Sequence, residues 1–149
     1  MVRTPIVAYT DGACKGNPGP GGWASIMQFG QHEKELTGGC HSTTNNRMEL
    51  TAVIETVCAC KRPCAIHIVT DSTYVMSKKH KKNRDLWEAL DKAVRAGGHS
   101  LSFEHVYGHK GHPLNERCDR LASKAAEDAY VDHLFEMNNE FELEIPEPW

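Results

Sequence analysis

The order of strands and helices is the feature that most restricts the fold of this chain. Residues 5–13 are rich in β-forming side chains and lead into a loop of Gly and Pro residues, as expected of a strand. A helix is expected from about Thr44 to Cys60, where apolar residues recur at helical spacing before Pro63. Residues 65–70 then form a strand that follows this helix and precedes another. Such a strand is expected to lie parallel to the first strand in one sheet.

The other elements complete one layered domain. Strands at about 23–29 and 33–40 follow the first strand closely, which predicts an antiparallel meander. Further along the chain we expect a short helix after Asp71, a helix at about 85–96, a strand at 101–107 and a last helix that begins at Pro113. The predicted fold class is α/β, a mixed five-stranded sheet (antiparallel meander plus parallel strands) with helices on both faces.

Charge is distributed unevenly along the 149 residues. The net charge is −3, yet residues 127–149 carry eight acids and no Lys or Arg, so residues 1–126 are net +5. We expect one catalytic domain at 1–130 and an acidic C-terminal tail at 131–149. A basic body is compatible with a nucleic-acid partner.

No apolar run approaches the roughly 20 residues that span a bilayer. The sequence enters its first strand without a secretory signal, so the six cysteines are expected to stay reduced. These features predict a cytoplasmic protein with no membrane association, and we expect a monomer.

Four acidic residues stand in separate short motifs on different elements. They are Asp11 in Tyr-Thr-Asp-Gly, Glu49 in Asn-Asn-Arg-Met-Glu-Leu, Asp71 in Ile-Val-Thr-Asp-Ser and Asp119 in Asn-Glu-Arg-Cys-Asp. If the fold gathers them, each close pair costs about 4 kcal/mol at 4 Å and an effective dielectric of 20. Divalent cations relieve that repulsion and support phosphoryl transfer. The pattern therefore favours a metal-dependent enzyme that acts on phosphodiesters.

Each acid taken alone has a simpler interpretation. Asp71 precedes a helix and could be its N-cap. Asp11 precedes Gly12 and could belong to a turn. Glu49 and Asp119 could be solvated positions on their helices. The neighbours of the four acids decide between these interpretations.

Long motifs around the acids resemble one known family. They are Tyr-Thr-Asp-Gly-Ala-Cys-x-Gly-Asn-Pro-Gly-Pro-Gly-Gly, Thr-Thr-Asn-Asn-Arg-Met-Glu-Leu, Thr-Asp-Ser-x-Tyr-Val and Gly-His-x-Gly-His-Pro-x-Asn-Glu-Arg-Cys-Asp-x-Leu-Ala. In this order, over about residues 6–126, they resemble type I ribonuclease H in its bacterial stand-alone form. The resemblance implies an endonuclease that hydrolyses the RNA strand of RNA–DNA hybrids and leaves 5′-phosphate and 3′-hydroxyl ends.

The resemblance also implies roles for individual residues. Two Mg²⁺ ions, with Mn²⁺ as a possible substitute, would be held by Asp11, Glu49, Asp71 and Asp119. His109 would assist proton transfer or product release, and an imidazole can do so near neutral pH. The expected contacts with the hybrid are Cys14, Asn17, Asn45 and Asn46 in the minor groove and Thr44 and Asn83 at a phosphate of the DNA strand.

The chain departs from many bacterial members of the family in one segment. These relatives carry a basic helix and loop, called the handle, between the third motif and the Asp-Leu-Trp helix. Here only ten residues separate Tyr74 from Asp85, although residues 78–84 still hold five cations. We therefore expect weaker hybrid binding than in relatives with a handle, partly compensated by this run.

Two other functions remain open at this stage. Integrases, transposases and resolvases share the fold class, but their acidic motifs differ. The second alternative is a non-catalytic or partner-dependent nucleic-acid-binding module of the same fold, which the missing handle slightly favours.

Overall fold

The computed structural model describes residues 2–107 and 111–144, with side chains as far as residue 137. In chain order its elements are β1 (Thr4–Cys14), β2 (Gly19–Phe29), β3 (His32–Thr43), α1 (Asn45–Ala59), β4 (Cys64–Thr70), α2 (Thr73–Ser77), α3 (Arg84–Gly97), β5 (Ser100–His105) and α4 (Pro113–Glu144).

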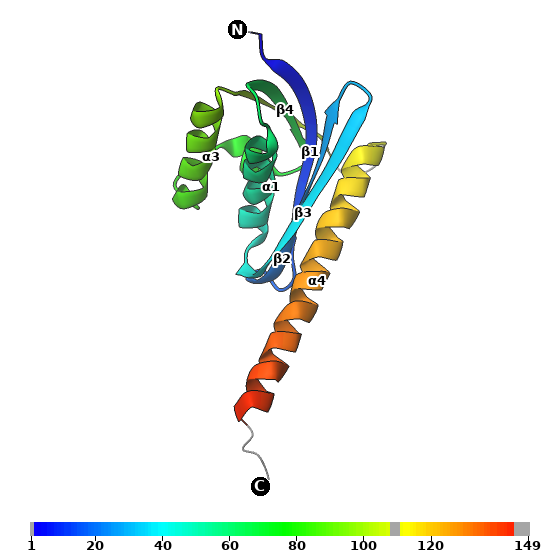
Figure 1. Ribbon diagram of the computed structural model, residues 1–149, viewed down its shortest axis with the longest axis vertical. Coiled ribbons are helices and arrows are strands. Elements are labelled where there is room, and N and C mark those ends of the chain that lie inside the picture. Colours follow the sequence, from blue (N-terminus) through cyan, green and yellow to red (C-terminus); the bar gives the residue numbers. More distant parts are fainter. Residues whose placement is uncertain (1, 108–110, 145–149) are drawn as a thin grey trace.

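The strands form one sheet in the order β3-β2-β1-β4-β5. The β1–β2 and β2–β3 pairs are antiparallel, whereas β1–β4 and β4–β5 are parallel. Helix α1 packs on one side of the sheet and α3 packs against α1, whereas α4 runs along the other side against β1, β2 and β3 (Figure 1). The predicted mixed sheet with helices on both faces is confirmed.

Two apolar clusters hold these layers together. The larger cluster lies between the sheet and α1, where Leu50, Val53, Ile66 and Ile68 are almost fully buried. The smaller one joins the sheet to α4 and contains Ala24, Ile26, Cys118 and Ala122. Small side chains dominate the second cluster, so α4 can approach the sheet closely.

The last helix is longer than the sequence indicated. The chain continues as helix α4 through the expected domain boundary at residue 130 and as far as Glu144. Residues 114–144 contain no Gly or Pro, and many are good helix formers. The first part of the acidic tail is therefore helical. Among the described residues, no helix is both long enough and apolar enough to cross a membrane.

Candidate active site

The register of the parallel strands places Asp11 beside Asp71. The last parallel pair between β1 and β4 is Tyr9 with Val69. Asp11 and Asp71 each follow two residues later, so their side chains lie just beyond the same end of the β1–β4 pairing and on the same side. This neighbourhood follows from the βαβ arrangement that the sequence predicts.

Helix α1 brings Glu49 to these two residues. The side chain of Thr44 caps the helix by accepting a hydrogen bond from the backbone N–H of Arg47, at 3.3 Å. The helix then passes so close to β1 that a Cβ on Gly12 would overlap the backbone nitrogen of Glu49. The absence of a side chain at Gly12 therefore lets the carboxylate of Glu49 approach that of Asp11.

Helix α4 positions the fourth acid. The thiol of Cys118 is buried and donates to the carbonyls of Tyr9 at 3.2 Å and Ala24 at 3.3 Å, which fixes this turn of α4 on the sheet. Asp119, next in the chain, is half-buried and contributes to the raised pKa of Asp11. The carboxylate of Asp119 thus lies beside that of Asp11.

Three carboxylates offer oxygen atoms within 4.8 Å of one another: those of Asp11, Glu49 and Asp71. Asp119 is not part of this tightest group. Asp11 and Glu49 are only 3% and 6% exposed. One oxygen of each, Oδ2 of Asp11 and Oε2 of Glu49, has no hydrogen-bond donor among the described residues. Buried oxygens without donors are costly unless a cation completes the site.

Burial and neighbouring carboxylates raise the pKa of both Asp11 and Glu49. Burial, followed by the charges of Asp71 and Asp119, raises the pKa of Asp11 to about 8. Burial and the charges of Asp11 and Asp71 raise the pKa of Glu49 well above its usual range. Without a cation, the cluster therefore retains protons near neutral pH. A divalent cation displaces such protons when it binds.

The simpler interpretations of three acids are wrong. The N-cap of α2 is Ser72, whose hydroxyl accepts from the backbone N–H of Val75 at 3.1 Å, so Asp71 does not cap the helix. Asp11 lies inside β1 rather than in a turn. Glu49 is buried rather than solvated.

Four of the six expected substrate residues line one hollow, which includes Asn46, three residues before Glu49 on α1. Asn17 accepts a hydrogen bond from the backbone N–H of Asn45 at 2.8 Å, which ties the β1–β2 loop to the start of α1. Cys14 lies under this loop and donates to the carbonyls of Gly19 and Thr43, both at 3.4 Å. A cavity of about 410 Å³ is lined by Asn17, Thr44, Asn46, Lys82 and Asn83.

A hydrogen-bond network that the sequence did not predict holds Asn83 in place. The hydroxyl of Tyr74 accepts from the Nδ2 of Asn83 at 3.1 Å and from the Nε1 of Trp87 at 2.9 Å, and it donates to the carbonyl of Lys82 at 2.8 Å. Arg47 donates to the Oδ1 of Asn83 at 3.2 Å. Tyr74 belongs to the Thr-Asp-Ser-x-Tyr-Val motif, but the residues that bond its hydroxyl lie 8 to 13 positions further along the chain. The motif alone therefore does not predict these hydrogen bonds.

Arg47 is itself anchored to α3. It donates two hydrogen bonds to the carboxylate of Asp85, at 3.0 and 2.8 Å. A two-point contact of this kind fixes the direction of the guanidinium as well as its distance. The start of α1 and the start of α3 are thus joined across the hollow.

The basic run 78–84 covers the segment between α2 and α3 and the first residue of α3, Arg84. The ring of His80 stacks on that of Trp87, with centroids 4.4 Å apart. Lys79, Lys81 and Lys82 are exposed and, among the described residues, make no ion pair within 4.0 Å. Together with Asn46, Tyr74 and neighbouring residues they line a second, larger hollow. Because Asn46 and Lys82 line both hollows, the two are adjacent.

Of the expected site residues, only His109 lies outside the described part of the chain. The others form two adjoining groups, four carboxylates and a set of short polar side chains. The oxygen-only ligand set suits a hard divalent cation such as Mg²⁺, and the unpaired buried oxygens of Asp11 and Glu49 are consistent with one.

Comparisons with known proteins agree with this geometry. The family model described as RNase H matches residues 3–127. A protein named Ribonuclease H from Cupriavidus metallidurans is 50% identical over 137 residues, which covers 80% of this chain and 93% of that protein. A protein of the same name from Neisseria meningitidis is 50% identical over 141 residues, covering 83% and 96%. The crystal structure of LC9-RNase H1, a type 1 RNase H with the type 2 active-site motif, is 26% identical with a TM-score of 0.74, covering 87% of this chain and 75% of that one.

Proposed function

Because this chain belongs to the ribonuclease H family, we propose that it is an endonuclease that hydrolyses the RNA strand of RNA–DNA hybrids and leaves 5′-phosphate and 3′-hydroxyl ends. The observation that carries the proposal is the convergence of Asp11, Glu49 and Asp71 within 4.8 Å, beside a hollow lined with polar side chains.

The carboxylates of Asp11, Glu49, Asp71 and Asp119 are proposed to hold two Mg²⁺ ions, which Mn²⁺ could replace. When bound, such ions supply activation of water and stabilisation of the leaving oxygen. The protein's part is to keep the four carboxylates fixed before the substrate arrives. Strand register fixes Asp11 and Asp71, and the close approach at Gly12 fixes Glu49.

The polar hollow is proposed to hold the hybrid. Recognition of RNA depends on 2′-hydroxyl groups exposed in the minor groove, which short donors and acceptors can reach. Cys14, Asn17, Asn45 and Asn46 lie along the β1–β2 loop and the start of α1. Glu49 would also accept from a 2′-hydroxyl.

A phosphate of the DNA strand would lie between Thr44 and Asn83, which line one cavity with Lys82. Lys79, Lys81 and Lys82 would add electrostatic attraction. Replacing a lysine that binds a phosphate should reduce the slope of log affinity against log salt by roughly 0.9. His109 is proposed to assist proton transfer or product release.

The chain is proposed to act as a monomer in the cytoplasm, with residues 1–130 as the catalytic domain. The test of the proposed reaction uses the purified chain with end-labelled RNA–DNA hybrid, RNA duplex and DNA duplex, each with Mg²⁺ or Mn²⁺. We expect cleavage of the RNA strand of the hybrid alone. Asp71→Asn should abolish cleavage while the circular dichroism spectrum stays unchanged. Full activity of that variant, or no cleavage by the parent chain, would refute the proposal.

A further inference from the structure

Two histidines and a glutamate meet at the outer side of the sheet, on β3 and the later part of α4. The Nδ1 of His41 lies 3.2 Å from the Oε2 of Glu136. The ring of His133 lies beside that of His41, with centroids 5.5 Å apart and planes tilted by 51°. None of these residues belongs to the proposed active site, and Glu136 lies beyond the residues that the family model matches.

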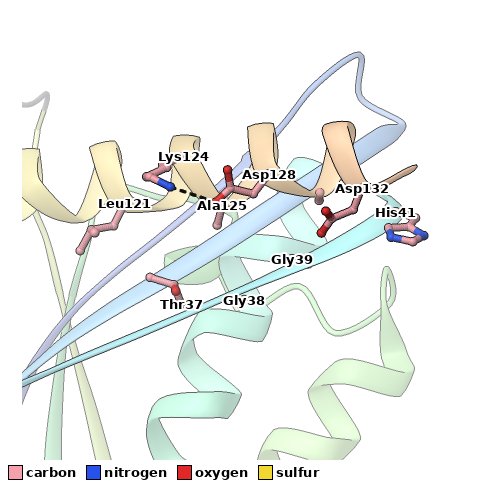
Figure 2. Close-up of a pocket in the computed structure, with 10 residues that line it drawn as sticks. Thr37, Gly38, Gly39, His41, Leu121, Lys124, Ala125, Asp128 and Asp132 are labelled. Carbon is pink, nitrogen blue, oxygen red and sulfur yellow. Dashed lines mark hydrogen bonds and ion pairs between the residues drawn. The ribbon is translucent and has the colours of Figure 1, made fainter. Parts of the chain in front are cut away.

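The surroundings of His41 are open to solvent. His41 and Glu136 expose 42% and 60% of their side chains. A groove of about 300 Å³ runs between β3 and α4, and Figure 2 shows His41 at one end of it with Asp132 beside it. A hydrated ion can therefore reach these side chains without any rearrangement of the backbone.

The separations match those around one tetrahedral ion. With bonds of about 2.0–2.1 Å, two donor atoms on such an ion lie about 3.4 Å apart, and the centres of two bound imidazole rings lie about 5 Å apart. The observed values are 3.2 Å between donor atoms and 5.5 Å between ring centres. His133 and Glu136 are three residues apart on a helix, so they lie on the same face.

One side-chain rotation separates this arrangement from a complete site. Among the described residues, only the acidic triad already has three donor atoms within 4.8 Å of one another. The ring of His133 must therefore turn to direct a nitrogen toward His41 and Glu136. Rotation about χ2, a broad torsion in histidine, turns the ring nitrogens while the ring stays close to that of His41.

We propose that His41, His133 and Glu136 form a second, non-catalytic metal site for a borderline transition-metal cation, for which Zn²⁺ is the probe. Imidazole nitrogens favour zinc, nickel and copper over magnesium, whereas the all-oxygen set at Asp11 suits magnesium. With three protein ligands, water would complete the tetrahedron. The bound ion would tie the later part of α4 to the end of β3.

The test measures thermal unfolding of the full chain during a Zn²⁺ titration, with saturating Mg²⁺ to occupy the acidic site and a reductant to keep the thiols free. A ligand that binds only the folded state raises Tm. The parent chain should show a saturable rise. His41→Asn and His133→Asn should each weaken Zn²⁺ binding at least about tenfold in competition with a chelating dye. Cleavage of hybrid in Mg²⁺ alone should be unchanged in both variants.

Two controls distinguish this site from other zinc ligands. His67 forms a comparable exposed pair with Glu104 at 2.9 Å but has no second histidine beside it among the described residues, so His67→Asn should leave zinc binding unchanged. Co²⁺ reports the donor atoms, because thiolate ligands give an intense charge-transfer band in the near ultraviolet. We expect the d–d bands of a tetrahedral site without that band. Thiolate bands, no rise in Tm, or undiminished binding by His41→Asn would overturn the proposal.

Discussion

The hydroxyl of Tyr74 accepts a hydrogen bond of 3.1 Å from the side-chain amide of Asn83, which lines the hollow proposed to hold a DNA phosphate. The same hydroxyl also accepts from the indole of Trp87, which is 3% exposed. Tyr74 therefore determines where Asn83 stands, although it is not itself expected to touch the scissile bond.

Tyr74→Phe should weaken substrate binding more than it slows chemistry. The change removes the acceptor for Asn83 and for Trp87, and an unsatisfied buried donor costs about 1–3 kcal/mol. We expect KM for the hybrid to rise severalfold while kcat changes by less than about twofold, since each 1.4 kcal/mol corresponds to a factor of ten. Steady-state kinetics would measure both. Tyr130→Phe, at an exposed position on α4, is the matched control. A fall in kcat with unchanged KM would contradict this role.

Asp11→Asn should abolish cleavage and yet stabilise the metal-free protein. The Asp11 carboxyl has a folded pKa of about 8 and an ordinary value of 3.8. Between those pH values the folded state binds more protons than the unfolded state, so its stability is lost as pH rises through that window. In EDTA, the Tm advantage of the variant over the parent should grow from pH 6.5 to pH 8.5.

With added Mg²⁺ the parent chain should have a higher Tm than Asp11→Asn, because Mg²⁺ stabilises the parent and has less effect on the variant. Thermal unfolding with EDTA and with Mg²⁺ would measure both differences. Equal Tm values for the two proteins at pH 8.5 in EDTA would show that charge repulsion at the site is unimportant.

Gly12→Ala should damage both the fold and the site. Its Cβ would overlap the backbone of Glu49, so α1 must shift away from β1. Overpacking of this kind costs about 1–3 kcal/mol, and it would also move Glu49 away from Asp11. We expect a lower Tm and a loss of activity larger than the loss of folded protein explains. Gly30→Ala is the control: it meets no atom within 4 Å, and only its positive φ of 57° is unfavourable.

His99 should make the protein sensitive to acid. It is 7% exposed, and its Nδ1 accepts a hydrogen bond from the backbone N–H of Cys64 at 3.0 Å. Burial, followed by the charge of Arg3, lowers the pKa of His99 below its ordinary value of 6.5. The unfolded state then binds the proton first, so stability should fall as pH drops below about 6.5.

Unfolding in urea at several pH values would measure this dependence. His99→Asn should be less stable than the parent at neutral pH but should lose less stability on acidification. His67→Asn, at a partly exposed position, should follow the parent curve. If His99→Asn loses as much stability on acidification as the parent chain does, groups other than His99 cause the acid sensitivity.

The sequence was sufficient to predict the sheet and the approach of Asp11 to Asp71, for a physical reason. Strand and helix patterns are local, and a parallel pair joined through a helix has few possible arrangements, so Asp11 and Asp71 could be placed side by side. The network around Tyr74 could not be predicted in the same way, because it depends on how α2, α3 and the connecting segment pack. The role of Gly12 likewise depends on the distance between α1 and β1.

The sequence predicts a shorter last helix than α4, because the acidic composition of residues 131–149 is typical of a tail. Six acids and no Lys or Arg occur in 131–149, but Glu, Leu and Met are also good helix formers. Charge indicates which partners a segment repels, whereas the absence of Gly and Pro indicates whether a helix continues. Here the second criterion was the informative one.

A chain that ends at Tyr130 should keep its fold and its activity. Ala126 and Ala129 are buried against the sheet and remain, whereas Val131, Leu134 and Phe135 are 55%, 41% and 64% exposed. The deletion leaves 14 acids and 17 bases, so the net charge changes from −3 to +3. We expect kcat within about twofold of the parent value and, in low salt, a lower KM for the polyanionic substrate, with the difference fading as salt screens the charges. Loss of folding would show that residues 131–149 belong to the domain, and an unchanged KM at low salt would show that their charge does not reach the substrate.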